Sequence, residues 1–402
     1  MAPTIELPAE SPDLHLSPQP TPEECTQIWT ATAASWKDSL TLPEYLAEAQ
    51  YLATVPLARD GGMTRWILVN KKLPPGQRQI FCSCETFQKR ALFSDERGSV
   101  EECIVHGVAS VFCPPEYRGR GYGTRLMKEL GKVLQSGREA DHGKKIIGSI
   151  LYSDIGKKYY ARLGWMPNPR NGHFVFPPVE MVSKKSTLSA QLIPKSGFGK
   201  LCLRDEAMVR RAMAMPSTSR KRVVILPDLD HLLWHIRKED FATDHIFGKK
   251  AEAKGPIAGS PGKQVWALWV RRYYEHPDHP YEEGGENALY ILRLVVEGDS
   301  TANKSPEGHS PLASTDVYAE QAAALQAVLQ AAQTEAARWR LDHVHLWEPS
   351  PLVHSLLEQS RLDTTWVERQ ETSIASALWF TDDGNAVEDA PVWVNNEYYA
   401  WC

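Results

Sequence analysis

The first half of the chain alternates short apolar runs with segments of helical periodicity. Residues 21–57 have helical spacing that Pro43 interrupts, which predicts two consecutive helices. Five apolar runs predict strands, over residues 65–70, 80–87, 103–113, 145–152 and 173–176. A longer helix is predicted over residues 121–135, because four apolar residues fall on one helical face. These four are Leu126, Leu130, Val133 and Leu134. Residues 155–163 predict a shorter helix.

The second half repeats this order of elements. Strands are predicted over residues 288–297, 342–347 and 374–380, and helices over residues 318–341 and 351–359. The resulting order of strand, helix, strand, helix, strand matches that of residues 103–176. Such alternation is common in mixed domains, but the match favours a degenerate second copy of the first fold.

A segment rich in Ser, Lys and Gly separates the two halves. Residues 184–200 have no clear period, which is typical of a boundary between domains. We therefore expect an N-terminal extension over residues 1–20, a first domain over residues 21–185 and a second domain over residues 200–402. Residues 298–315, inside the second domain, predict a long irregular loop.

The composition is that of a globular protein with a slightly acidic balance. Of 402 residues, 42% are hydrophobic, and 45 Lys and Arg against 50 Asp and Glu give a net charge of −5. Nonspecific nucleic-acid binding requires a strongly basic surface, so no nucleic-acid partner is expected. The sequence has neither a secretory signal nor a run of about 18 apolar residues, so no membrane partner is expected. Seven cysteines without a ladder spacing favour a reducing, cytoplasmic compartment.

The most specific motif is a glycine-rich turn between a predicted strand and a predicted helix. It reads Arg118-Gly119-Arg120-Gly121-Tyr122-Gly123-Thr124. Glycine lets the backbone approach a ligand closely, and the free N–H groups of a helix N-terminus bind phosphate. The spacing differs from the GxGxxG of dinucleotide-binding turns, and the turn lacks the Gly-Lys-Ser/Thr of a P-loop. It therefore predicts a pyrophosphate site of another kind.

This turn resembles the Q/R-x-x-G-x-G/A motif of the GNAT acetyltransferase superfamily. Arg118, Gly121 and Gly123 carry the resemblance, and the segment YYARLGW over residues 159–165 is similar to the superfamily's tyrosine-to-Gly-aromatic segment. The resemblance implies an α/β (α+β) fold in which a mixed sheet is flanked by helices. Together with the repeated order of elements, it predicts a degenerate GNAT-like fold for the C-terminal domain, which lacks the CoA motif and should not bind a second acetyl-CoA.

More narrowly, the chain resembles the fungal lysine N6-acetyltransferase family. The features that carry this resemblance are Ser83-Cys84-Glu85-Thr86, His106-Gly107-Val108, Trp234-His235, Lys238-Glu239-Asp240-Phe241 and residues 395–402. This resemblance extends over nearly the whole chain. It implies transfer of an acetyl group to the N6 amine of L-lysine, as part of lysine catabolism.

The superfamily resemblance implies acetyl-CoA as the cosubstrate and assigns residues to it. The N–H groups of the glycine-rich turn would hold the pyrophosphate, and the backbone of the preceding strand would pair with the pantetheine arm. One N–H there, that of Phe112, would polarise the thioester carbonyl. The implied cofactor-binding residues are Val111, Phe112, Cys113, Arg118, Gly119, Arg120, Gly121, Tyr122, Gly123 and Thr124.

Three side chains are candidates for proton transfer. The resemblance implies that Tyr160 protonates the leaving thiolate, with Tyr159 as the next choice. An alkyl ammonium has a pKa near 10.4, so the acceptor also needs a base or a desolvating pocket. Glu85 is the favoured base, and His106 is the runner-up because the intrinsic pKa of an imidazole is near neutral. Strand alternation places His106 on the same face as Ser110 and Phe112, which leaves open whether it points at the site or away from it. Structural roles remain the alternative for each of these residues.

The function predicted is that of an acetyl-CoA-dependent N-acetyltransferase acting by direct attack on the primary amine of a small molecule. Another small amine, such as a polyamine, an amino sugar or a toxic amine metabolite, stays open as the acceptor. A non-catalytic acyl-CoA-binding or protein-modifying module is the alternative from another class. No metal is expected, because the helical pair His231 and His235 has no third ligand at a defined spacing. The oligomeric state stays open.

Tryptophan is unevenly distributed along the chain. Nine of the 13 tryptophans lie from Trp234 onward, in the half without the cofactor motif. Large aromatic side chains provide pocket walls as well as buried area. We therefore expect the second half to cover the acceptor site, with Trp266, Trp269 and Trp401 as the candidates to face it.

Overall fold

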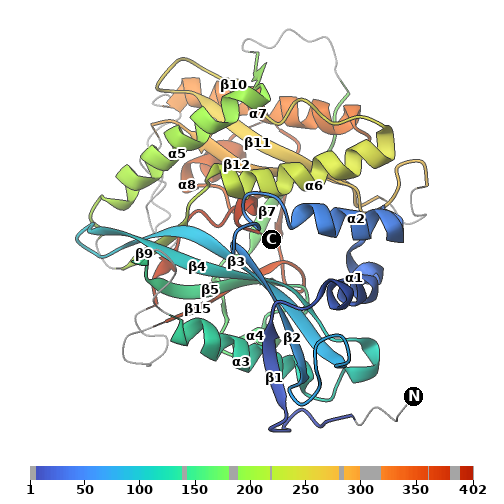
Figure 1. Cartoon of the computed structure of the whole chain (residues 1–402). Coiled ribbons are helices and arrows are strands. Elements are labelled where there is room, and N and C mark those ends of the chain that lie inside the picture. The colour runs from blue at the N-terminus through green and yellow to red at the C-terminus, as the bar shows by residue number, and fades with distance from the viewer. Residues whose placement is uncertain are drawn as a thin grey trace.

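Two mixed sheets, each flanked by helices, make up the architecture (Figure 1). The computed structural model describes residues 6–137, 143–180, 189–217, 220–279, 285–298, 318–360, 362–380 and 390–401. The first sheet has the order β1 (Leu14–Pro18), β2 (Met63–Asn70), β3 (Ile80–Ser94), β4 (Val100–Phe112), β5 (Ile146–Ser153), β15 (Ile374–Trp379) and β6 (Met166–Pro167). β9 (Arg222–Ile225) pairs with the later residues of β3, beyond those that pair with β2, and β16 (Val392–Trp393) pairs with β9.

The second sheet lies above the first in Figure 1. Its order is β14 (Thr365–Glu368), β7 (Gly172–Phe176), β13 (His343–Trp347), β12 (Ala288–Val296), β11 (Val265–Arg272), β10 (Pro256–Ala258) and β8 (Gln191–Leu192). The helices are α1 (Pro22–Trp36), α2 (Leu42–Leu52), α3 (Tyr122–Ser136), α4 (Lys158–Ala161), α5 (Phe198–Met213), α6 (Leu229–Phe247), α7 (Ala319–Arg338) and α8 (Pro351–Glu358). These mixed, helix-flanked sheets confirm the predicted α/β class.

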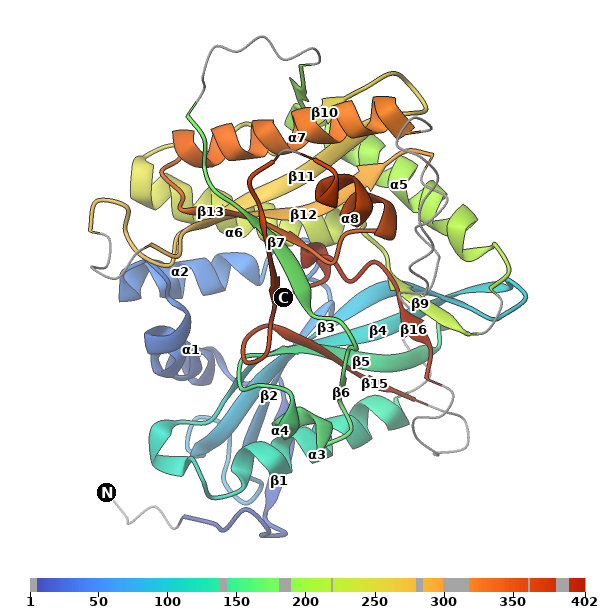
Figure 2. The same cartoon turned by 180° about the vertical axis from the view of Figure 1, so that it is seen from behind.

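The cores lie in layers on either side of the two sheets. Apolar residues of α3, including Leu126 and Leu130, pack with strand residues on the outer face of the first sheet. A second core joins the facing sides of the two sheets and includes residues of α5 and α6. The third lies between the second sheet and the helices α7 and α8. Figure 2 places the C-terminus near the middle of the molecule, between the sheets.

The two sheets repeat one pattern of strands. In the first, β3 and β4 are antiparallel, α3 follows β4, and β5 returns parallel to β4. In the second, β11 and β12 are antiparallel, α7 follows β12 along the chain, and β13 returns parallel to β12. This correspondence is the structural basis of the repeat that the sequence predicted.

The halves exchange the strand that completes each repeat. β7 follows β5 in the chain but pairs with β13 and β14 of the second sheet. β15 follows β13 in the chain but pairs with β5 and β6 of the first sheet. The strand pairing therefore crosses the predicted boundary at residues 185–200 in both directions, and the division into domains remains a prediction.

Other expectations differ in detail from the structure. Residues 14–18 of the expected N-terminal extension form an ordered strand that pairs with β2. Neither α5 nor β11 was predicted from the sequence. Val133, placed on the apolar face of α3, is 40% exposed, because the buried stripe follows residues 126, 130 and 134. Residues 299–315 of the predicted loop lie outside the described residues.

Candidate active site

Two parallel strands separate next to the glycine-rich turn. β4 and β5 pair from Ile104 opposite Ile146 to Val108 opposite Leu151. Beyond that point β4 continues to Phe112 and β5 to Ser153 without pairing with each other. Unpaired N–H and C=O groups on a strand edge can pair with an extended ligand. The opening can therefore accept an extended chain along the edge of β4.

A β-bulge reorients the end of β4. Between Glu85 opposite Ala109 and Ser83 opposite Phe112, β3 advances by two residues and β4 by three. Ser110 lies in this bulge with a φ of 53°, in the left-handed region. The extra residue reverses the strand alternation, so the expectation that His106 shares a face with Ser110 is wrong.

The glycine-rich turn leads directly into α3. Gly119 has a φ of 75° and Gly121 a φ of 89°, and Gly121 is the N-cap of the helix. A side chain is strained in this left-handed region, which explains glycine at both positions. A Cβ on Gly119 would have no neighbour within 4 Å, so the backbone there is accessible. An open backbone at a helix N-terminus fits a pyrophosphate group.

The two arginines of the turn already have protein partners. The Nε of Arg118 donates to the backbone oxygen of Cys113 at 3.0 Å, and its guanidinium lies over the ring of Phe112. Arg120 forms an ion pair with Glu6, whose carboxylate also accepts from the hydroxyl of Tyr122 at 3.1 Å. The N-terminal segment thus lies against the turn, and an incoming phosphate would compete with Glu6 for Arg120.

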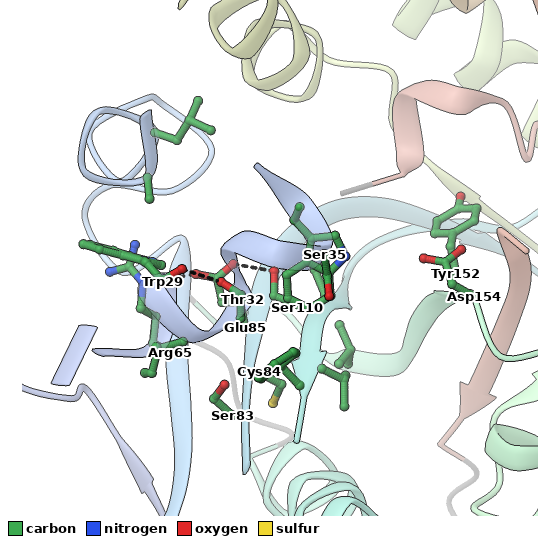
Figure 3. Close-up of a pocket in the computed structure, with 18 of the residues that line it drawn as sticks. Trp29, Thr32, Ser35, Arg65, Ser83, Cys84, Glu85, Ser110, Tyr152 and Asp154 are labelled. Carbon is green, nitrogen blue, oxygen red and sulfur yellow. Dashed lines mark hydrogen bonds and ion pairs between the residues drawn. The ribbon is translucent and has the colours of Figure 1, made fainter. Parts of the chain in front are cut away.

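A cavity of about 430 Å³ opens beside the separated strands (Figure 3). Glu85 and Tyr160 both line it, together with the last residues of β4, from Val108 to Phe112. In Figure 3, Glu85 lies between Arg65 and Ser110, with Tyr152 and Asp154 across the cavity. The structure thus brings two of the three proposed proton-transfer residues to one cavity with the end of the motif strand.

Both oxygens of Glu85 are held by neighbouring side chains. The Nε of Arg65 donates to Oε1 at 3.1 Å, and the hydroxyl of Ser110 donates to Oε2 at 3.0 Å. Arg65 also lies over the ring of Trp29, which orients its guanidinium. These contacts fix the carboxylate at the wall of the cavity, in a position to accept a proton directly or through water.

The neighbouring tyrosines Tyr159 and Tyr160 occupy different places. Tyr160 is buried and lines the cavity, and burial raises its pKa above the ordinary range, so the phenol stays protonated at neutral pH. The hydroxyl of Tyr159 instead lies 3.4 Å from that of Thr124, in the first turn of α3. A Cβ on Gly123 would lie 3.0 Å from the same Tyr159 hydroxyl. Tyr160 is therefore placed at the cavity and Tyr159 at the glycine-rich turn.

His106 is buried outside this cavity. His106 is absent from the described residues that line the cavity. Its Nδ1 has no hydrogen-bond partner among the described residues. Alternation along β4 places His106 on the face opposite to Ala109, the residue that pairs with Glu85. The structure therefore does not bring the runner-up base to Glu85 and Tyr160.

The buried His106 gives a pH dependence of stability. Burial lowers its pKa to about 4, whereas an unfolded imidazole titrates near 6.5. Between these values the unfolded chain binds a proton that the folded chain does not, so the free energy of unfolding falls as the pH falls. From pH 7.5 to pH 5 this group removes about 2 kcal/mol. Urea denaturation at pH 7.5 and pH 5 should show that the free energy of unfolding falls by about 2 kcal/mol less in His106→Gln than in the wild type. An equal fall in both proteins would contradict the lowered pKa of His106.

No metal site is found in the parts of the chain that the structure describes. The pair on α6 is held by other contacts, because the Nδ1 of His231 lies 2.8 Å from Asp228 and the Nε2 of His235 lies 3.1 Å from the backbone oxygen of Tyr399. Burial raises the pKa of the Cys84 thiol, which makes this cysteine a poor nucleophile at neutral pH. No described helix is long and apolar enough to cross a membrane.

The cavity also contains charged side chains that the sequence analysis did not single out for the site. Glu48 of α2, Lys238 of α6 and Arg272 of β11 line its wall. A sequence signal for Glu48 exists, since it lies on the same face of its helix as the buried Tyr45 and Leu52. A carboxylate in an apolar stripe indicates a buried polar contact.

Of the three tryptophans that were expected to face the acceptor site, Trp401 lines the cavity, whereas Trp266 and Trp269 lie in the cores.

Comparison with known families identifies the second half. The family model described as the LYC1 GNAT-like C-terminal domain matches residues 173–402. The chain belongs to the LYC1 GNAT-like family. This membership confirms the resemblance to the GNAT superfamily and the GNAT-like fold of the second half, which the repeated strand pattern also shows.

Two curated relatives are similar to this LYC1 GNAT-like chain. An uncharacterized protein of Saccharomyces cerevisiae is 21% identical over 263 residues, covering 56% of this chain and 64% of the relative. A lysine acetyltransferase of Yarrowia lipolytica is 23% identical over 158 residues, covering 36% of this chain and 38% of the relative. The chain thus spans less than two thirds of the length of either relative.

A solved structure is also similar to this LYC1 GNAT-like chain. It is a GCN5-related N-acetyltransferase from Kribbella flavida, with a TM-score of 0.46 and 16% identity. The match covers 91% of this chain and 70% of that chain.

Gly121 offers a test of the turn as a cofactor site in this family member. Gly121→Ala forces a side chain into a φ of 89° and places its Cβ 3.3 Å from that of Ala9, so the backbone at the start of α3 must shift. We expect CoA affinity, measured by calorimetry, to fall about tenfold, for a cost of about 1–2 kcal/mol. Gly76→Ala is the matched control, because Gly76 has a φ of 78° in open space, outside the residues that line the cavity. Equal CoA affinity in both variants would contradict the assignment.

Proposed function

We propose that this protein transfers an acetyl group from acetyl-CoA to the primary amine of a small molecule, most specifically the N6 amine of L-lysine. The observation that carries this proposal is that Glu85, Tyr160 and the end of β4 that does not pair with β5 line one cavity. Membership of the LYC1 GNAT-like family and the relative named a lysine acetyltransferase support the proposal.

Each group in the cavity has a role in direct transfer. Glu85 takes the proton from the acceptor ammonium, directly or through a water, so that the neutral amine attacks the thioester carbonyl. The backbone N–H of Phe112 stabilises the oxyanion that forms. Tyr160 donates its phenolic proton to the departing thiolate. Val111 and Cys113 hold the pantetheine arm, and the N–H groups of residues 119–124 hold the pyrophosphate.

An acceptor screen with acetyl-CoA tests the proposal. The full chain is incubated with L-lysine, polyamines, amino sugars and an acetylatable peptide, and released thiol is measured. We expect thiol release with L-lysine and N6-acetyl-lysine as the product. Binding of CoA without thiol release for any amine would overturn the proposal in favour of a non-catalytic module. Release with the peptide alone would favour a protein-modifying role.

A further inference from the structure

One carboxylate in the wall of the cavity has an oxygen without a partner. The side chain of Glu48 is 2% exposed. Its Oε2 accepts a hydrogen bond from the Nζ of Lys238 at 2.7 Å, whereas its Oε1 has no hydrogen-bond partner among the described residues. A buried carboxylate oxygen without a donor is unfavourable, because it has lost water without gaining a hydrogen bond. A ligand that supplies a donor to this oxygen would therefore bind more tightly.

Two cations lie in the same wall as Glu48. The side chain of Lys238 is 25% exposed, and its ammonium has three donors, of which Glu48 takes one. Asp38 holds the guanidinium of Arg272 through contacts of 3.1 and 3.3 Å. Arg272 also lies over the ring of Trp401, 5.0 Å from its centroid. One unpartnered anionic oxygen thus shares the cavity wall with two cationic side chains.

This charged group extends away from the proton-transfer residues. Glu48, Lys238, Arg272 and Trp401 also line a smaller adjoining cavity of about 40 Å³. Glu85, Ser110 and Tyr160 line only the larger of these two cavities. Glu48 is therefore placed to bind a part of the acceptor other than the reacting amine.

Resting on the proposed function, we propose that Glu48 binds a second cationic group of the acceptor, while Lys238 and Arg272 face an anionic group of the same molecule. An ammonium and a carboxylate on one carbon meet both requirements. A linear diamine offers an ammonium to Glu48 but no anion to the two cations. An amino sugar with a single amine offers neither a second ammonium nor a carboxylate. The subsite therefore selects an α-amino acid whose side chain carries the amine to be acetylated.

The test compares acceptors that differ by one charged group. L-Lysine carries both groups, 6-aminohexanoate lacks the α-ammonium, and 1,5-diaminopentane lacks the carboxylate. With the wild type, removing the α-ammonium should raise KM about ten- to hundredfold, which corresponds to a hydrogen bond between charged groups. Glu48→Gln should raise KM for lysine by a similar factor, change KM for 6-aminohexanoate less than about twofold, and lower kcat little.

Control measurements separate this subsite from a structural role. Asp244→Asn breaks another lysine–carboxylate contact on α6, outside the cavity, and should leave both KM values unchanged. An equal rise of KM for lysine and 6-aminohexanoate in Glu48→Gln would overturn the proposal. Should that variant not fold, equal KM values for the two acceptors with the wild type would overturn it as well.

Calorimetry distinguishes failure of the subsite from failure of the proposed function. L-Lysine and 6-aminohexanoate are titrated into the CoA-bound full chain without acetyl transfer. Tighter binding of lysine that depends on Glu48 would support the subsite even if no transfer occurs. Transfer to lysine with no preference over 6-aminohexanoate would support the function and overturn the subsite.

Discussion

Replacing Tyr160 by phenylalanine is expected to lower kcat by about 10²- to 10⁴-fold, the usual contribution of a positioned general acid. The substitution removes the hydroxyl and keeps the ring, which is buried in the wall of the cavity. The affinity for acetyl-CoA should change little, because the proton transfer occurs in the transition state. Initial rates at varied acetyl-CoA and acceptor concentrations separate kcat from the two KM values.

Tyr159→Phe is the matched control for this prediction. It removes the neighbouring hydroxyl, which contacts Thr124 at the start of α3 and not the cavity. Its effect should therefore fall on the KM for acetyl-CoA and not on kcat. If Tyr159→Phe lowers kcat more than Tyr160→Phe does, the roles of the two tyrosines are exchanged.

The second large effect is expected for Glu85→Gln. At pH 7.5 the kcat/KM for the acceptor should fall about 10²-fold, because the amide cannot accept the proton of the acceptor ammonium. The rate of the variant should then depend on the free amine alone and rise about tenfold per pH unit toward pH 10.4. The wild type should level off at a lower pH, so the ratio of the two rates shrinks as the pH rises.

Glu102→Gln serves as the control for the change of charge. Glu102 is a paired carboxylate near the start of β4, at the opposite end of the strand from the cavity. Its rate profile should run parallel to that of the wild type. A parallel profile for Glu85→Gln as well would show that Glu85 orients Arg65 and Ser110 and does not act as the base.

The glycine-rich turn and Tyr160 were predictable from the sequence because their signals are local. Three closely spaced glycines follow a strand and lead into the first turn of a helix, and the structure places Gly119 and Gly121 in the left-handed region. Tyr160 follows from its fixed spacing to Gly164. Such features depend on a few adjacent residues, so they can be recognised from periodicity and motif spacing.

The acceptor side was less predictable because distant segments build it. The bulge at Ser110 arises where two strands are paired with one extra residue, and simple alternation therefore misplaced His106. Glu48 and Lys238 meet only when α2 packs beside α6. No local sequence pattern indicates which helices pack together, so this contact can be identified only in the folded structure.

The strand exchange has a consequence for any attempt to divide the chain. A fragment that ends at residue 185 would contain β7 without its neighbours β13 and β14, and would lack β15, which covers the free edge of β5. An uncovered edge is a template for pairing with another polypeptide. Such a fragment is thus expected to self-associate or swap strands with its copies, and co-expression of the missing half is expected to restore a soluble complex. Each repeat therefore depends on the other for its stability, because each supplies a strand that completes the sheet of its counterpart.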